Sequence, residues 1–258
     1  MKLVIKIGSS TLTHEGGGIN IRRFHKLCQV VADLMNAGNK VVLVSSGAIA
    51  MGVSKLGLSR HPEDMPTKQA VSAVGQCELM DSYDRTFGEF GHTVGQILLT
   101  GADIEDPARL GNFINTVERL LEMGVLPIIN ENDTVETEEI AVGDNDTLSA
   151  IVASAISADL LVILSDIDGL YSGDPRKDPD AKLIPVVYEL TPDIMNGAGG
   201  AGTRRGTGGM QTKLTAAGIV TATGCDMIIA QGSNPEILYD IVEGKPVGTR
   251  FPSRKAGE

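Results

Sequence analysis

The sequence predicts an α/β fold in which helices cover both faces of a mainly parallel β-sheet. Short apolar runs alternate with segments that carry apolar residues at helical spacing along all 258 residues. Such alternation is typical of parallel sheets, because each crossover between parallel strands needs a helix-sized connection. Hydrophobic residues make up 42% of the chain, which is enough to fill the core of such a fold. Because no linker and no repeat of fixed period divides the chain, we expect one domain.

Six short apolar runs have the length and composition of buried strands. They are nearly continuous in apolar residues, which is typical of strands that are covered on both faces. The predicted strands are residues 3–7, 41–44, 94–99, 125–129, 160–164 and 227–230.

Five segments with apolar residues near helical spacing follow or separate these strands. Gly38 and Gly124 come after two of them and are plausible helix C-caps, since glycine adopts the left-handed conformation that ends many helices. The predicted helices are residues 21–36, 68–87, 110–123, 147–157 and 214–223.

Composition excludes several classes of partner. The chain carries 22 basic and 33 acidic residues, and its net charge of −11 argues against nucleic acid or an anionic membrane. The cysteines Cys28, Cys77 and Cys225 lie far apart and, like the four histidines, lack the spacing of metal ligands. No apolar segment approaches the roughly 20 residues that span a membrane, and the N-terminus does not resemble a signal peptide. We therefore expect a cytoplasmic protein without a metal site built from its own side chains.

Small polar residues follow four of the predicted strands. In open α/β sheets, ligands bind beyond the carboxyl ends of the strands. Any one of these segments could be a plain turn, but four in succession favour a binding site. They are residues 8–10, 45–48, 130–133 and 165–166.

Residues 206–213 form a glycine-rich segment, Gly-Thr-Gly-Gly-Met-Gln-Thr-Lys, that ends in a lysine. Glycines let the backbone bring its N–H groups against an anion, and the predicted helix that follows places its positive end at the same point. The segment lacks the Gly-Lys-Ser or Gly-Lys-Thr ending of the common P-loop. We therefore expect a phosphate site of another kind.

Lys6 lies within the first predicted strand, where a buried ammonium is unfavourable without a counter-charge. The alternative is an edge strand with Lys6 in solvent. The apolar neighbours Val4, Ile5 and Ile7 favour a buried strand instead. Lys6 is then a cation that reaches a phosphate over the glycine turn at Gly8.

Three polar segments suit an amino-acid ligand. Residues 45–50 join a strand to a helical segment, where backbone N–H groups and serine hydroxyls can bind a carboxylate or phosphate. The alternative is an ordinary N-cap serine. Residues 130–133 and 143–146 combine Asp, which suits an ammonium, with Asn, which suits a carboxylate. The alternative for residues 143–146 is a cap for the helix that starts near Thr147.

Five motifs, taken together, resemble the glutamate 5-kinases, a branch of the amino acid kinase family. They are residues 6–10, 45–50, 130–133, 143–146 and 206–213, and the resemblance runs in order from residue 2 to about residue 251. It implies a three-layer αβα sandwich around a mainly parallel sheet. It also implies a kinase that uses ATP to phosphorylate the side-chain carboxylate of L-glutamate. The products are L-glutamyl 5-phosphate and ADP, in the first step of proline biosynthesis.

Carried over motif by motif, the resemblance assigns roles to individual residues. Lys6 and Lys213 are the catalytic cations that flank the transferring phosphoryl group, and Asp146 holds both lysines in place. The expected glutamate-binding residues are Ser46, Gly47, Ala48, Asp133 and Asn145. The expected ATP-binding residues are Lys6, Gly8, Ser165, Asp166, Thr207, Gly208, Gly209, Met210, Gln211, Thr212 and Lys213.

The resemblance has further implications for organisation and partners. Glutamate binds the N-terminal part, about residues 1–150, and ATP binds the C-terminal part, about residues 151–251. Mg²⁺ is carried on the nucleotide, proline is a feedback inhibitor, and the protein is a homo-oligomer, either a dimer or a tetramer. Many family members carry a C-terminal RNA-binding-type PUA domain. The chain stops soon after the kinase region, so we expect a single kinase domain, residues 1–258, without that addition.

The chemistry of carboxylate phosphorylation agrees with the residues that the motifs contain. A glutamate side chain is ionised at neutral pH, with an unperturbed pKa of roughly 4.3, so the nucleophile needs no general base. It needs relief from repulsion by the phosphates, which two lysines and Mg²⁺ supply. The alternatives are another kinase of the family, for acetylglutamate, aspartate, carbamate or a small phosphate, and a non-catalytic nucleotide or amino-acid sensor. A free amino acid is favoured because Asp133 suits an ammonium that acetylglutamate lacks.

Overall fold

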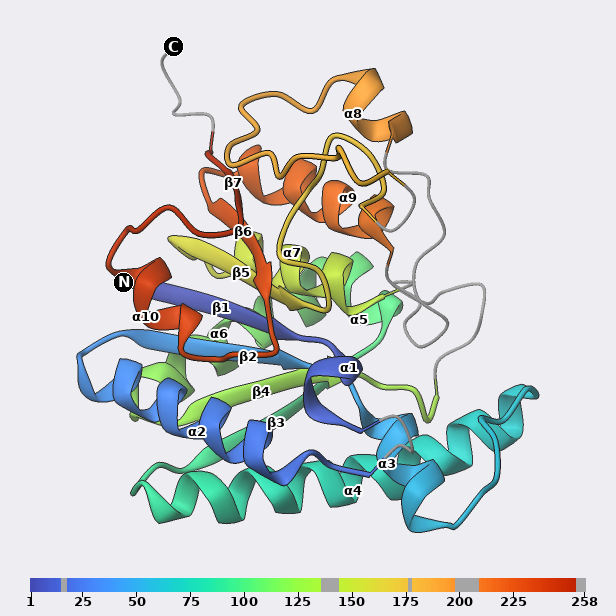
Figure 1. The fold of residues 1–258 in the computed structure, drawn as a ribbon. Coiled ribbons are helices and arrows are strands. Elements are labelled where there is room, and N and C mark those ends of the chain that lie inside the picture. Colours follow the sequence, from blue (N-terminus) through green and yellow to red (C-terminus); the bar gives the residue numbers. More distant parts are fainter. Residues whose placement is uncertain (15–17, 136–143, 176–177, 198–208, 254–258) are drawn as a thin grey trace.

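The computed structural model describes residues 1–14, 18–135, 144–175, 178–197 and 209–253. In these residues a seven-stranded sheet has the order β3-β4-β2-β1-β5-β6-β7 (Figure 1). Neighbouring strands are parallel except β6 and β7, which are antiparallel. The strands are β1 Lys2–Ile7, β2 Lys40–Ser45, β3 Val94–Leu99, β4 Leu126–Glu131, β5 Leu160–Ser165, β6 Asp226–Gln231 and β7 Thr249–Phe251.

Helices cover both faces of this sheet, so the predicted three-layer αβα architecture is confirmed. One apolar core forms between the sheet and α2, α4 and α10, and a second core forms between the opposite face and α6, α7 and α9 (Figure 1). The helices of the described residues are α1 Ser9–Leu12, α2 Ile21–Asn36, α3 Ala48–Lys55, α4 Met65–Glu89, α5 Gly101–Glu105, α6 Pro107–Glu122, α7 Asn145–Ala155, α8 Pro192–Gly197, α9 Met210–Thr221 and α10 Ile237–Val242.

Strand β1 lies in the middle of the sheet, and this position decides the environment of Lys6. It pairs with β2 on one side and β5 on the other, so that Lys6 stands beside Val44 and Ile163. The edge-strand alternative for Lys6 is therefore wrong. Because side chains alternate along a strand, Ile5 and Ile7 enter the core under α2, while Lys6 points to the face that α7 and α9 cover.

The predicted elements match the observed ones closely where the apolar pattern is long. Helix α2 spans the predicted residues, and Gly38 and Gly124 follow their helices with φ of +88° and +71°, as expected for C-terminal glycines. The pattern did not reveal α1, α5, α8 and α10, which have four to six residues each, or the three-residue strand β7. Elements this short contain too few residues to display a period.

Four helices, α4, α6, α7 and α9, begin two to four residues earlier than their apolar patterns predict. Helix α4 starts at Met65 because the Asp64 side chain accepts a hydrogen bond from the Thr67 N–H at 2.9 Å. Helix α9 starts at Met210, immediately after the N-cap Gly209, and not at residue 214. Lys213 therefore belongs to the first turn of a helix and is not the end of a loop. Methionine, glutamine and lysine are good helix formers, so the helix can begin where the glycines stop.

Helices α3 and α4 pack with their backbones in contact at two glycines. A Cβ atom added to Gly75 would lie 1.7 Å from the Ala48 carbonyl oxygen, and one added to Gly52 would lie 2.0 Å from the Val71 carbonyl oxygen. Both positions therefore require glycine, and the contact holds α4 against the start of α3.

Replacing Gly75 with alanine is expected to destabilise the protein by about 1–3 kcal/mol, because the two helices must separate to admit the methyl group. Gly88→Ala is the matched control, since a Cβ atom at Gly88 meets nothing within 4 Å and that residue also lies in α4. The control is expected to raise the free energy of unfolding slightly, by up to about 1 kcal/mol. Urea unfolding measures the change in the free energy of unfolding for both variants. Equal changes at Gly75 and Gly88 would contradict the close contact between α3 and α4.

Candidate active site

Three buried charged residues from three elements meet on one face of the sheet. The Lys6 Nζ atom from β1 lies 2.7 Å from Asp146 Oδ1, and the Lys213 Nζ atom from α9 donates a hydrogen bond to Asp146 Oδ2 at 3.0 Å. The exposed fractions of Lys6, Lys213 and Asp146 are 8%, 5% and 0%.

This cluster carries an excess of positive charge. Among the ion pairs of the described residues, Asp146 is the carboxylate that contacts both ammonium groups, so two cations share one anion. Burial raises the pKa of Asp146, but the charges of Lys6 and Lys213 outweigh burial and hold that pKa below its ordinary value. Asp146 is therefore ionised at neutral pH. The remaining positive charge makes the cluster a site for an anion.

The start of α7 explains how Asp146 is held. Asp144 is the N-cap, and its Oδ1 atom accepts hydrogen bonds from the backbone N–H groups of Asp146 and Thr147 at 2.6 and 3.0 Å. The helix-cap interpretation of this segment is therefore correct for Asp144. Since Asp144 caps the helix, the side chains of Asn145 and Asp146 can make other contacts.

A chain of amide and hydroxyl groups extends from the charge cluster. Asn145, next to Asp146, donates hydrogen bonds to Ser46 Oγ at 2.7 Å and to Asn130 Oδ1 at 3.0 Å. Asn130 in turn donates to Gln76 Oε1 at 3.0 Å. The buried Asn145 Oδ1 atom has no hydrogen-bond partner among the described residues. An acceptor of this kind suits a ligand that brings a donor, such as an ammonium.

The turn after β2 presents backbone rather than a serine cap. Gly47 is the N-cap of α3, has φ of +111° and makes no side-chain capping bond. The interpretation of this segment as an ordinary N-cap serine is therefore wrong. The Ser46 N–H donates to the Ile7 carbonyl at 3.0 Å, which ties the turn to β1 one residue after Lys6.

Asp133 lies beyond the end of β4 and is partly buried. Its Oδ2 atom accepts a hydrogen bond of 2.7 Å from the hydroxyl of Ser72, which lies on α4 and is 2% exposed. Asp133 thus keeps a fixed orientation beside the amide chain that ends at Gln76, four residues further along α4.

The residues expected at the nucleotide lie at the ends of β1 and β5 and at the start of α9. The Ser165 hydroxyl donates to Asp166 Oδ1 at 3.1 Å, and Gln231, the last residue of β6, donates to the Asp166 carbonyl at 3.3 Å. A Cβ atom added to Gly8 would lie 3.7 Å from Lys6 Nζ, so the absence of a side chain there leaves the ammonium approachable.

The N-terminus of α9 adjoins the charge cluster. Gly209 caps it without a side-chain bond, and Met210 and Gln211 open its first turn. The Thr212 hydroxyl lies 2.8 Å from both Asp146 Oδ2 and the Gly209 carbonyl and can donate to either. Two further residues expected at the nucleotide, Thr207 and Gly208, lie outside the described residues.

Sequence reasoning missed the contribution of α4 to the site. Ser72 and Gln76 contact Asp133 and Asn130, yet neither was among the expected site residues. One signal was present: the two residues share a helical face with the buried Leu79 and Tyr83, at spacings of four, seven and eleven residues from Ser72. Polar residues that interrupt a buried helical face indicate partners elsewhere in the fold.

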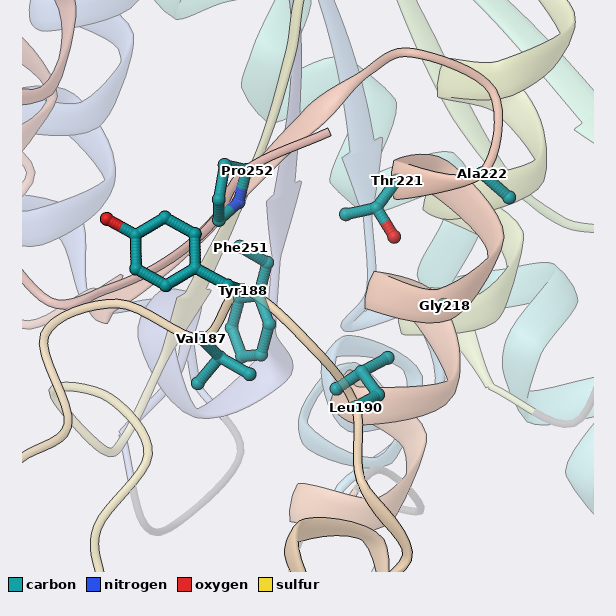
Figure 2. Close-up of a pocket in the computed structure, with 8 residues that line it drawn as sticks. All are labelled: Val187, Tyr188, Leu190, Gly218, Thr221, Ala222, Phe251 and Pro252. Atoms are coloured by element: carbon teal, nitrogen blue, oxygen red, sulfur yellow. The ribbon is translucent and has the colours of Figure 1, made fainter. Parts of the chain in front are cut away.

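A separate pocket opens between α9, the end of β7 and the segment at Val187 to Leu190 (Figure 2). None of the residues expected at the site lines it. Its lining residues are Val187, Tyr188, Leu190, Gly218, Thr221, Ala222, Phe251 and Pro252.

Within the residues that the structure describes, no three His, Cys, Asp or Glu side chains gather as a set of metal ligands. No helix of the described segments is long and apolar enough to cross a lipid bilayer.

Comparison with known proteins identifies relatives that match nearly the whole chain. The model of the amino acid kinase family matches residues 1–231. A glutamate 5-kinase of Clostridium perfringens is 53% identical, with 98% of this chain and 96% of that protein covered. One of Clostridium tetani is 54% identical over 98% of this chain and 95% of its own length. Another, of Caldanaerobacter subterraneus, is 50% identical over 97% of this chain and 68% of its own length.

Solved structures share the fold at much lower sequence identity. A carbamate kinase from Giardia lamblia, bound to AMP-PNP, has a TM-score of 0.69 at 19% identity, with 98% of both chains covered. An isopentenyl phosphate kinase of T. acidophilum has a TM-score of 0.67 at 19% identity, with 97% of this chain and all of that chain covered. These likenesses bear on the fold alone.

Proposed function

Because the chain belongs to the amino acid kinase family, we propose that it transfers the γ-phosphoryl group of ATP to the side-chain carboxylate of L-glutamate. The products are L-glutamyl 5-phosphate and ADP, and the reaction is the first step of proline biosynthesis. The observation that carries the proposal is the net positive cluster of Lys6, Asp146 and Lys213 beside the amide chain at Asn145. The positive cluster suits a phosphoryl group in transfer, and the amide chain suits an amino acid.

In the proposed reaction, a side-chain carboxylate oxygen of glutamate attacks the γ-phosphorus. The new O–P bond forms as the bond between that phosphorus and the β,γ-bridging oxygen breaks, and ADP leaves with the electron pair. No proton has to be removed, since the carboxylate is already ionised. The barrier arises mainly from bringing two anions together in line, and it is lowered by fixed positive charge and by positioning.

Lys6 and Lys213 provide the fixed positive charge on either side of the transferring group. The negative charge of Asp146 offsets the repulsion between the two ammonium groups. It also keeps both lysine side chains extended toward the same point. Since the charge is buried, it acts more strongly than it would in water. Mg²⁺ carried on the ATP phosphates neutralises further charge when it is bound, and Asp146 is committed to the lysines rather than to the metal.

Glutamate binds between the turn after β2, the part of α4 that carries Ser72 and Gln76, and the start of α7. Asp133 and the Asn145 Oδ1 atom accept from its ammonium, and Ser46, Gly47 and Ala48 bind its carboxylate groups. ATP binds on the other side of the lysines, at Gly8, Ser165, Asp166 and the 207–213 segment. The N-terminal part, about residues 1–150, thus binds glutamate, and the C-terminal part, about residues 151–251, binds ATP.

Three further properties belong to the proposal. Proline acts as a feedback inhibitor, the enzyme works as a homo-oligomer, and it works in the cytoplasm. All three are what the resemblance of the sequence motifs to the glutamate 5-kinases implies.

The acceptor is tested by trapping the acyl phosphate with hydroxylamine. The purified chain is incubated with Mg-ATP and either glutamate, aspartate or N-acetylglutamate, and the hydroxamate is measured as its ferric complex. Glutamate is expected to give product, and the other two at least about tenfold less. N-acetylglutamate lacks the ammonium that the site accepts, and the side chain of aspartate is one methylene too short to bring its carboxylate in line with the γ-phosphorus. Hydroxamate from aspartate but not from glutamate would overturn the assignment.

A further inference from the structure

Tyr83 is a fully buried polar residue that no step of the proposed reaction uses. Its ring lies in the core beneath α2, with centroids 4.7 Å from Phe24 and 6.1 Å from Phe87. Its hydroxyl lies 2.8 Å from the Ser45 hydroxyl, and both residues are 0% exposed. Ser45 is the last residue of β2 and immediately precedes Ser46.

The direction of the hydrogen bonds along this contact is determined by the chemistry of the groups. The Ser45 hydroxyl donates to the Ser46 carbonyl oxygen at 3.1 Å, and a carbonyl can only accept. With the Ser45 proton used in this way, the Tyr83 hydroxyl donates to Ser45 Oγ, the arrangement that gives both protons an acceptor among the described residues. Burial raises the pKa of Tyr83 well above its ordinary value, so the phenol keeps its proton at every pH at which the enzyme is expected to work.

This relay acts on one peptide unit of the proposed glutamate site. In a planar trans peptide, the C=O and N–H groups point in opposite directions. When Ser45 holds the Ser46 carbonyl toward the core, the N–H of Gly47 points away from the core. Among the described residues, no backbone carbonyl accepts the Gly47 N–H. This donor is thus presented to a ligand.

We propose that Tyr83 is a positioning residue for glutamate binding, which acts through Ser45 to orient the Ser46–Gly47 peptide toward the substrate. The inference rests on the proposed function, because Gly47 belongs to the glutamate site only if that function is correct. Asn145 tethers the same turn independently, through the Ser46 side chain. Loss of the relay therefore frees the peptide plane without releasing the Ser46 hydroxyl.

The test compares Tyr83→Phe with the wild-type enzyme in the full chain. The KM for glutamate is expected to rise about fivefold, the scale of one lost neutral hydrogen bond. The kcat and the KM for ATP are expected to change by less than about twofold, because neither lysine is disturbed. Ser45→Ala is expected to give the same result, and the double variant no more than either single change, since both residues belong to one relay.

Tyr239→Phe is the matched control. Its hydroxyl bonds to Asp33 at 2.6 Å, between α10 and α2, and its removal is expected to leave the KM for glutamate unchanged. Thermal unfolding of each variant separates loss of fold from loss of positioning, and Ser45→Ala decides the question if Tyr83→Phe does not fold.

Three results would overturn the inference: an unchanged KM for glutamate in Tyr83→Phe, an equal rise in the KM for ATP, or independent effects that add in the double variant. The assays use whichever amino acid the wild-type enzyme phosphorylates. Failure of the glutamate assignment is therefore seen in the wild-type enzyme, and failure of the Tyr83 role is seen only in the comparison of variants.

Discussion

Lys213→Ala is expected to lower kcat by about a hundredfold or more, the scale of losing one transition-state charge contact. Lys213 is 5% exposed and shares Asp146 with Lys6, so its charge acts in a site where water screens it poorly. Steady-state release of ADP with saturating glutamate and Mg-ATP measures the change. Lys213→Met keeps the length of the side chain but removes its charge. It is expected to lower kcat to a similar degree as Lys213→Ala, because the charge of Lys213 and not its size lowers the barrier.

Lys245→Ala is the control for general effects of removing a lysine. Lys245 pairs with Asp240 and Glu243 at the surface and has a side-chain exposure of 55%. The turnover of Lys245→Ala is expected to match the wild-type value, since surface ion pairs contribute little to stability. Turnover of the folded Lys213 variants within about threefold of the wild type would remove Lys213 from the mechanism.

Asp146→Asn is expected to have the largest effect on stability. It leaves two buried ammonium groups without their counter-charge, and breaking a buried ion pair from one side typically costs about 3–5 kcal/mol. Activity is expected to fall as well, because the lysines then repel each other. Urea unfolding at neutral pH measures the loss of stability, with Asp240→Asn, at the exposed pair with Lys245, as the control.

The same variant carries a pH signature. The pKa of folded Asp146 lies below the ordinary value of 3.8, so its ionised form stabilises the fold above that pH. This stabilisation is lost as the pH falls through the folded-state pKa, where the wild-type carboxyl also becomes neutral. The difference in unfolding free energy between wild type and Asp146→Asn is therefore expected to narrow in acid. A difference that stays constant down to about pH 3 would contradict the lowered pKa.

The sheet could be predicted from the sequence because its strands are short, continuous apolar runs. Lys6 could be placed in a buried strand for the same reason, since its neighbours are apolar on both sides, and the structure puts that strand in the middle of the sheet. The position of Lys213 was predicted less well. Glycines before it suggested a loop, but Gly209 is the N-cap, and the helix starts three residues before the lysine. Helix starts that lack a side-chain cap leave little signal in a sequence.

The contacts of the site could not be predicted from local pattern. Asp146 and Lys213 are 67 residues apart, and Ser72 and Asp133 are 61 residues apart, so only the topology of the sheet brings them together. The pairing of Asp146 with both lysines was expected from family resemblance and not from spacing. The roles of Ser72, Gln76 and Tyr83 were not expected at all, because α4 carries many polar residues and the sequence does not show which of them face the interior.

The central claim is that an ionised side-chain carboxylate attacks the γ-phosphorus of ATP at the Lys6–Asp146–Lys213 cluster. Glutamate labelled with oxygen-18 in its side-chain carboxylate tests this directly. The acyl phosphate cyclises when the glutamate amine attacks its carbonyl carbon, and the phosphate released then keeps the bridging oxygen. Mass spectrometry is expected to find one labelled oxygen in each phosphate formed by the wild-type enzyme, and very little phosphate from Lys213→Ala. Unlabelled phosphate from the wild-type enzyme would mean that water, and not the carboxylate, is the nucleophile.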